Sequence, residues 1–302
     1  MSREELAEAD LAALVPGPRS MIWRYASDPR ILAASAYALV LQLAHPTVAH
    51  AVREHSVYQR NPIERLLRST DYLAVMCFGA PDAALRTARA LREMHKRIKG
   101  VAPDGRSYHA FEPEAWAWVH VTLADAMLAG NRNFARPMSE DERERFYAEW
   151  RSVGRLVRVG EADLPGDWAG YREYFDRMVA ERLEDNDQVQ GFLEFIQREV
   201  RSPLPMVDGS AWRVVWAPFG RLFWLVTVGL LPPELRERFG VRWSFAREGE
   251  FRALSAASRV TTPLMPAVTR VISPENILRW RRELIGREFL ASAQGHTTKD
   301  KT

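Results

Sequence analysis

The stretch Leu41–Arg68, LQLAHPTVAHAVREHSVYQRNPIERLLR, places three histidines, a helix-breaking proline and an Arg-x-x-Arg pair in one apolar neighbourhood. Pro46 lacks the amide hydrogen that a continuing helix needs, so a helix should break there. Pro62 stands where a first helical turn favours proline, so another helix should begin there. We expect helices on both sides of the break, and one wall of a cofactor site within this stretch.

The helical pattern extends over most of the chain. Apolar residues recur at three- and four-residue spacing between Gly and Pro signals, and period-two alternation is nearly absent. Ser139 and Glu142 have the Ser-x-x-Glu form of a helix capping box. The sequence predicts an all-α fold of about ten or more helices in a single large domain. The expected helices are residues 30–45, 47–56, 62–78, 81–99, 112–129, 139–158, 168–183, 187–200, 211–228, 232–238, 244–260 and 275–288.

Length and composition favour one large core. The chain has 302 residues, and its 10 Trp, 13 Phe and 8 Tyr are ample for a buried interior. Gly/Ser-rich linkers are absent, and residues 201–205 are interpreted as a loop within the domain. We expect a flexible arm over residues 1–20, the helical domain over residues 21–290 and a disordered tail over residues 291–302.

Charge and cysteine content argue against several classes of protein. The net charge is +3, and arginines are spread over every segment rather than concentrated as in a nucleic-acid binder. The single cysteine, Cys77, excludes an intramolecular disulfide and a cysteine-based zinc cluster. The acidic amino terminus does not have the form of a signal peptide. Gln42, His45 and Pro46 make the apolar stretch 31–52 a buried core helix rather than a membrane span. We expect a cytoplasmic protein, with peripheral membrane contact as an addition.

Several catalytic motifs are absent. The sequence contains no Gly-x-Gly-x-x-Gly, no phosphate-binding loop and no Gly-x-Ser-x-Gly elbow, which argues against nucleotide-dependent and serine-hydrolase chemistry. No histidine follows a glutamate at the Glu-x-x-His spacing of di-iron carboxylate bundles.

His95 is the polar member of an apolar helix face. It shares that face with Ala84, Ala88, Leu91 and Ile98, which recur at helical spacing. A buried imidazole needs a partner for each nitrogen. A hydrogen-bonded core histidine and a ligand of a metal or haem iron both meet this need, and the residues leave both interpretations open.

The helix that begins at Pro62 offers a facing wall. Two guanidinium groups, Arg65 and Arg68, continue into an apolar stripe with Ser69 and Tyr72. Burial of a guanidinium is costly unless an anion meets it. A haem propionate or a protein carboxylate would serve, and a pair of solvated surface arginines is the alternative.

The other histidines are weaker candidates. His45, His50 and His55 are five residues apart, so they cannot all converge unless Pro46 breaks the helix. His50 or His55 can still face a cofactor pocket together with Glu54. His120 follows two tryptophans at helical spacing, which fits a core position or a supporting position beside a ligand.

Several motifs, in their order and spacing, resemble those of the rubber oxygenase catalytic domain family. That family contains the latex-clearing proteins and the oxygenases of the mycophenolic acid pathway type. The similarity covers most of the chain, to about Arg270. The motifs include Leu43-Ala-His45-Pro46, Val52-Arg-Glu54-His55-Ser56, Arg65-Leu-Leu-Arg68-Ser69, Phe78-Gly79, Tyr108-His-Ala110, Trp118-Val-His120 and Leu231-Pro-Pro-Glu-Leu-Arg236.

The resemblance implies an all-helical fold around a non-covalent b-type haem, with His95 as the iron ligand. In the latex-clearing branch an Arg-x-x-Lys-Thr motif lines the open side of the iron, and Arg65, Arg68 and Ser69 match it. Because an arginine cannot lose its proton to coordinate iron, Arg68 argues against the closure of the site by a lysine. A catalytic glutamate of that branch corresponds to Glu54.

The expected function is that of a haem-dependent oxygenase, which combines dioxygen with an apolar small molecule such as an alkene or isoprenoid. A non-catalytic haem-binding protein and a metal-free helical carrier of apolar ligands are the alternatives. A homodimer is a candidate assembly, and no nucleic-acid partner is expected. The expected catalytic residues are Arg65, Arg68 and Glu54, and the expected haem contacts are His95, Arg65, Arg68, Ser69, Tyr72, His50 and His120.

Overall fold

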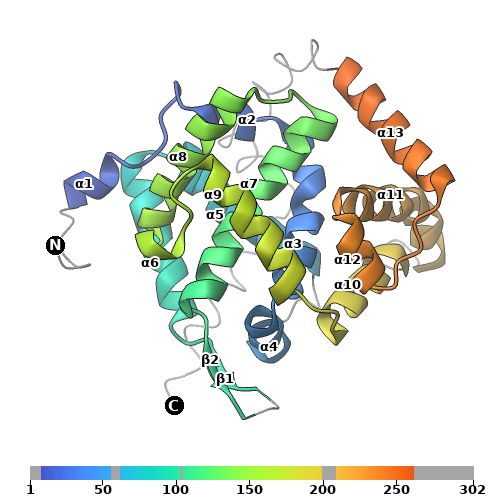
Figure 1. Ribbon diagram of the computed structural model, residues 1–302, viewed down its shortest axis with the longest axis horizontal. Coiled ribbons are helices and arrows are strands. Elements are labelled where there is room, and N and C mark those ends of the chain that lie inside the picture. Colours follow the sequence, from blue (N-terminus) through green and yellow to red (C-terminus); the bar gives the residue numbers. More distant parts are fainter. Residues whose placement is uncertain (1–7, 56–61, 103–104, 199–208, 262–302) are drawn as a thin grey trace.

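The structure is a computed structural model that describes residues 8–55, 62–102, 105–198 and 209–261. Within these residues the chain forms thirteen α-helices and one two-stranded antiparallel sheet (Figure 1). The predicted all-α fold is therefore confirmed. The elements are α1 (Glu8–Ala12), α2 (Met21–Ala26), α3 (Ser35–Leu43), α4 (Pro46–His55), α5 (Pro62–Phe78), α6 (Pro81–His95), β1 (Lys99–Val101), β2 (Ser107–His109), α7 (Pro113–Phe134), α8 (Glu140–Leu156), α9 (Trp168–Arg177), α10 (Asp187–Arg198), α11 (Gly209–Leu230), α12 (Pro233–Arg238) and α13 (Phe245–Val260).

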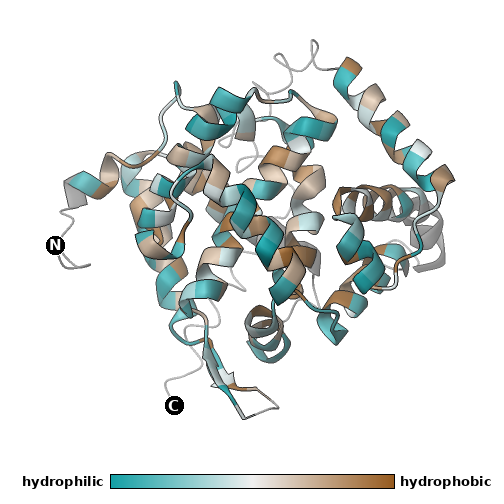
Figure 2. Ribbon diagram, in the orientation of Figure 1, coloured by the Kyte–Doolittle hydropathy of each residue, from teal (hydrophilic) through white to brown (hydrophobic). Residues whose placement is uncertain are grey.

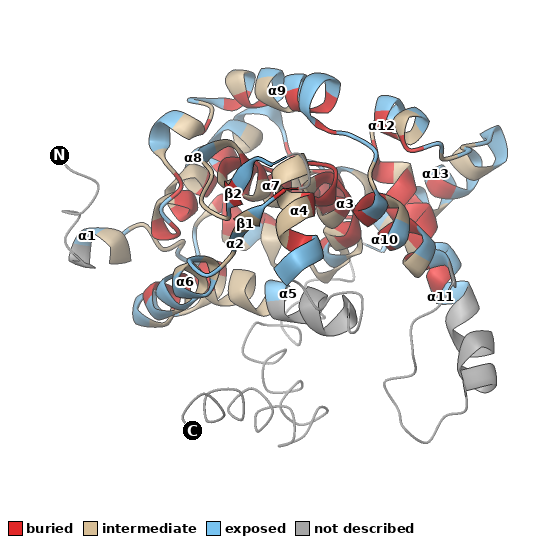
Figure 3. Ribbon diagram, turned by 90° about the horizontal axis from the view of Figure 1, so that it is seen from below, coloured by how far each residue is buried: buried red, intermediate tan, exposed pale blue. Residues whose placement is uncertain are grey.

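Helix α7 is the centre of the domain. It packs against α2, α3, α8, α13 and the 3-10 turn at Pro29–Ala34, and it is buried on most of its sides. A helix that is apolar nearly all round belongs in a core. Gly130 allows the turn to approach, because a Cβ there would lie 3.0 Å from the Cα of Ile31. Buried residues gather on α3 and α7 in Figure 3, and α11 is largely hydrophobic in Figure 2, whereas α9 presents a hydrophilic surface.

The break at Pro46 is a sharp bend. The helical segment Pro29–Leu43 and α4 meet at 103°. The carbonyls that the break releases find partners elsewhere, as buried carbonyls must: Leu43 accepts a hydrogen bond from the Asn186 side chain at 2.9 Å, and Ala44 accepts one from the Glu184 amide at 2.9 Å. The segment before α10 therefore holds the bend.

No single helix in the described part of the chain is both long and apolar enough to cross a membrane. The bent pair of Pro29–Leu43 and α4 meets the length and composition limits when the two are taken together.

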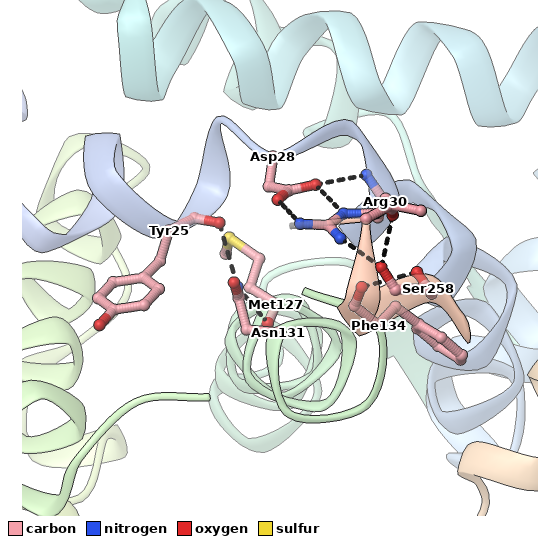
Figure 4. A network of polar contacts seen from close by, with 8 residues as sticks. Tyr25, Asp28, Arg30, Met127, Asn131, Phe134 and Ser258 are labelled. Carbon is pink, nitrogen blue, oxygen red and sulfur yellow. Dashed lines mark hydrogen bonds and ion pairs between the residues drawn. The ribbon is translucent and has the colours of Figure 1, made fainter. Parts of the chain in front are cut away.

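A polar network ties the amino-terminal segment to the far ends of α7 and α13 (Figure 4). Arg30 is paired with Asp28 and donates to the Ser258 carbonyl at 2.7 Å, and the Ser258 hydroxyl donates to the Phe134 carbonyl at 2.7 Å. Asn131 donates to the Tyr25 carbonyl at 3.1 Å. These bonds close the end of the core that lies away from the hairpin.

Most predicted helices are confirmed to within a few residues. Both hydrogen bonds of the predicted Ser139–Glu142 capping box are present. Four boundaries differ. The helix predicted over 112–129 continues to Phe134. The helix predicted from residue 30 begins with a 3-10 turn, the helix predicted over 168–183 ends in a π-helical turn at Met178–Arg182, and the helix predicted over 81–99 ends at His95. The last difference arises because Lys99–Val101 pairs with β2 around a turn in which Gly105 has φ +84°. The predicted helix 275–288, the loop at 201–205 and the tail 291–302 lie outside the described residues.

Candidate functional site

His95 is the last residue of α6, and its side chain is half-buried. Its Nδ1 lies 2.8 Å from the Leu91 carbonyl oxygen, one turn earlier in the same helix. A carbonyl can only accept, so Nδ1 carries the hydrogen and the lone pair of the neutral ring is on Nε2. Histidines that bind a metal through one nitrogen are commonly held in this way through the other.

An aromatic wall lies beside the His95 ring. Trp116 of α7 meets it edge to face, with ring centroids 5.1 Å apart, and Phe111 packs against Trp116 at 4.9 Å. The indole nitrogen of Trp116 donates to the Val157 carbonyl at 3.2 Å, which fixes the indole against the end of α8. The His95 ring, at the end of α6, therefore contacts an indole that α7 carries and the end of α8 holds in place.

Glu54 lies on the exposed side of α4 and is held by a buried tyrosine. The hydroxyl of Tyr108, on β2, donates to Glu54 Oε2 at 2.5 Å. Burial raises the pKa of Tyr108 to about 12, and the Glu54 carboxylate adds to this effect, so the phenol stays a donor at neutral pH. Gly100 makes the contact possible, because a Cβ there would lie 2.6 Å from Glu54 Oε2 and 2.7 Å from the Tyr108 oxygen.

Two of the three histidines of the Leu41–Arg68 stretch converge on the same tyrosine. His50 stacks on the Tyr108 ring at 6.3 Å, and His55 meets that ring edge to face at 6.3 Å. His55 also bonds the Lys99 carbonyl through Nε2 at 3.1 Å. These contacts tie α4 to the hairpin that follows α6.

The third histidine, His45, sits at the bend and points elsewhere. It is 1% exposed, and its Nε2 lies 3.3 Å from the Glu114 carboxylate, which also binds Arg182. Burial lowers the pKa of His45, although Glu114 opposes that effect. The cluster locks the start of α4 to the start of α7, where Thr47 and Glu112 make a second contact at 3.1 Å.

His120 belongs to the packing between α7 and α8. It is 6% exposed, its Nε2 donates to the Trp150 carbonyl at 2.9 Å, and its ring stacks on that indole at 4.7 Å. The Trp150 indole returns a bond of 2.9 Å to the His120 carbonyl. Because both rings are engaged with each other, we do not include His120 among the groups that would contact a cofactor.

The residues expected on the facing wall lie on α5, which packs along α6. Ser69 is exposed and Tyr72 is half-buried. Arg65 and Arg68 lie on the first turns of α5, but their side chains fall outside the described residues. Their approach to His95 stays a prediction.

The donor set fits a cofactor that brings most of its own metal ligands. Within the described residues no group of three or more His, Cys, Asp or Glu side chains is placed to hold a metal ion. A haem iron needs only one or two ligands from the protein, and His95 offers one nitrogen in the required tautomer. The His95 imidazole therefore fits the single protein ligand that a haem requires.

Comparison with known proteins defines the class. The described residues form an all-α domain, and the site contains one histidine whose tautomer is set by its own helix. The chain matches the family model described as ER-bound oxygenase mpaB/B'/Rubber oxygenase, catalytic domain, over residues 23–260, and it belongs to that family. It is 27% identical over 232 residues to an uncharacterised protein of Mycobacterium bovis and equally to one of Mycobacterium tuberculosis, and each alignment covers 76% of this chain and 87% of the relative. No solved structure matches the chain.

Tyr108 and Trp116 are the site residues that the sequence did not assign. Tyr108 lies within a quoted motif, and Trp116 is the first of the two tryptophans before His120, but a role for either depends on a contact between distant segments. The contacts Tyr108–Glu54 and Trp116–His95 join positions 54 and 21 residues apart in the chain. Helical periodicity carries no signal for such pairs.

Proposed function

We propose that this protein is a haem b-dependent oxygenase that oxidises an apolar small molecule, with an alkene or isoprenoid as the first class of substrate to test. The observation that carries the proposal is the His95 imidazole, which has Nδ1 bonded at 2.8 Å to its own helix in a chain of the oxygenase family. Haem, when bound, supplies the activation of dioxygen, which side chains alone do not provide.

The residues divide the remaining tasks. His95 would hold the iron through Nε2, while the Leu91 carbonyl keeps the hydrogen on Nδ1. Trp116 would stop the imidazole from rotating. Arg65 and Arg68 would donate hydrogen bonds to bound oxygen or to a propionate, and the half-buried Tyr72 would line the apolar wall.

Glu54 is the candidate base. Tyr108 occupies Oε2, so the carboxylate is fixed and Oε1 is the atom that would accept a proton from a substrate. His50 lies beside the pair and would shield its inner side. Cytoplasmic location, peripheral membrane contact and a homodimer stay predictions.

The test is the visible absorption spectrum of the purified protein, oxidised and then reduced with dithionite, with haem quantified against protein. We expect an intense Soret band that shifts on reduction, near one haem per chain. Oxygen uptake with a panel of alkenes should then match the loss of alkene. A colourless protein that also fails to bind added haemin would contradict the proposal and favour a metal-free carrier of apolar ligands.

A further inference from the structure

Arg92 is an unpaired cation one turn before His95. Its Nε is buried and has no hydrogen-bond partner, and its guanidinium forms no ion pair with any residue that the structure describes. Burial lowers its pKa, and the positive charge of Arg158 lowers it further. A partly buried guanidinium without an anion is costly, so a ligand that supplies the anion would stabilise it.

Arg158 stands where a helix end favours glycine. Helix α8 ends in a Schellman motif, in which Val159 donates to the Gly154 carbonyl at 2.9 Å and Arg158 donates to the Arg155 carbonyl at 3.1 Å. The residue in the left-handed conformation is Arg158, with φ +59°. A side chain in this conformation costs stability that glycine would not.

The same motif ends α12, and there the residue is a glycine. Val241 donates to Arg236 at 2.9 Å, Gly240 donates to Glu237 at 2.9 Å, and Gly240 has φ +64°. The fold thus uses the ordinary residue at one helix end and an arginine at the other. A strained side chain at one of two equivalent helix ends points to a role for that side chain.

Arg92 and Arg158 lie on the two segments that hold the contact between Trp116 and His95, and the Arg158 side chain is exposed. Arg158 directly follows Val157, whose carbonyl holds the Trp116 indole against the His95 ring. The neighbouring carboxylates are already engaged with other cations: Glu93 binds Lys96 at 2.6 Å, and Glu161 binds Arg155 at 2.7 Å. The charge of Arg158 therefore acts on Arg92, and neither arginine forms an ion pair with a residue that the structure describes.

We propose that Arg92 and Arg158 form a carboxylate-binding site next to His95. Two guanidinium groups can bind a planar carboxylate through paired hydrogen bonds. The aromatic wall beside His95 suits a carboxylate attached to an apolar body. A haem propionate and the carboxyl group of a fatty acid share this chemistry; the first source rests on the proposed function, and the second does not.

The first experiment is a titration with haemin and with its dimethyl ester, in which both propionates are masked. Wild type is compared with Arg92→Gln, Arg158→Gln and, as a matched control, Arg86→Gln, an exposed arginine of α6. If the carboxylate is a propionate, Arg92→Gln should weaken haemin binding on the order of tenfold. The dimethyl ester should bind wild type and Arg92→Gln equally weakly.

The second experiment measures the binding of dodecanoate by calorimetry in the absence of haemin. If the carboxylate is that of a free acid, wild type and Arg86→Gln should bind dodecanoate, and Arg92→Gln should lose on the order of tenfold in affinity. This outcome would support the site even if haemin does not bind, so the site and the proposed function can fail separately. Normal haem occupancy with equal affinities in Arg92→Gln, Arg158→Gln and Arg86→Gln for both probes would overturn the site alone.

Arg158→Gly separates a loss of binding from a loss of stability. Glycine relieves the left-handed position, so this variant should melt about 2 °C above wild type. It should nevertheless bind the carboxylate several-fold more weakly. A stabilised variant with unchanged affinity for both probes would show that Arg158 has no part in binding.

Discussion

His95 of α6 and His120 of α7 make the same type of hydrogen bond, but the two bonds have different structural roles. Each donates one ring hydrogen to a backbone carbonyl, at 2.8 Å and 2.9 Å respectively. The His95 bond stays within its own helix, and its ring is half-buried. The His120 bond joins two helices, and its ring is stacked on Trp150.

The difference separates a histidine that joins two helices from one whose tautomer is set within its own helix. Removal of the His120 ring would break a tertiary contact, so this residue serves the core. The Nδ1 bond of His95 stays within α6, so this bond fixes the tautomer of the ring and does not join two helices. An imidazole whose tautomer is set locally can give its second nitrogen to a ligand without a cost to packing.

The largest expected effect is therefore that of His95→Ala on the cofactor. We expect haem occupancy to fall from near one per chain to below about 0.1, because the iron loses its protein ligand. The free energy of unfolding of the haem-free protein should change by less than about 1 kcal/mol. Haem quantification and urea unfolding measure the two effects.

The matched control is His109→Ala, because His109 is an exposed histidine on β2. It should keep both haem and stability. Full haem occupancy in His95→Ala would refute the assignment of the iron ligand.

The contrast also marks how far the sequence could lead. Helical periodicity and the prolines at positions 46 and 62 predicted most of the helices and the break between α3 and α4, because these features depend on local geometry. The same periodicity extended α6 beyond His95, since a strand of three residues, Lys99–Val101, is too short for an alternating pattern to show. The environment of His95 could not be predicted, because its contact with Trp116 joins two helices and has no local sequence signal.

The second prediction concerns acid. Burial lowers the pKa of His120 to about 4, so the folded protein keeps this ring neutral while the unfolded chain, with the ordinary value of 6.5, takes up a proton. The contribution of His120 to the free energy of unfolding is fully present above pH 6.5 and is lost as the pH falls toward 4. The loss should amount to about 3 kcal/mol.

His120→Gln should flatten this pH dependence, because an amide can still donate to Trp150 but does not titrate. Urea unfolding at intervals between pH 4 and pH 7 measures it. The contribution of the buried His45, whose pKa is also lowered, should remain in the variant. Parallel profiles for wild type and His120→Gln would mean that another group controls the acid response.

At neutral pH, His120→Ala should lower the free energy of unfolding by about 2 kcal/mol, because a buried carbonyl loses its donor and a cavity forms. The site is tightly packed: a Cβ on Gly154 would lie 2.9 Å from His120 Nε2. Haem per folded chain should stay at the wild-type level, which is the opposite of the pattern for His95→Ala. Loss of haem from a folded His120→Ala protein would mean that His120 contacts the cofactor.

The smallest effect tests the link between the two regions. Trp116→Phe keeps an aromatic edge beside His95 but removes the bond to the Val157 carbonyl, so haem affinity should fall a few-fold, or about 1 kcal/mol. Trp23→Phe is the matched control, because it removes an equivalent indole bond of 2.9 Å to Pro16 on a different face of the core. Both variants should lose a similar amount of stability, and only Trp116→Phe should lose haem affinity. An equal loss of affinity in the two variants would mean that the His95 ring responds to the stability of the whole domain rather than to its aromatic wall.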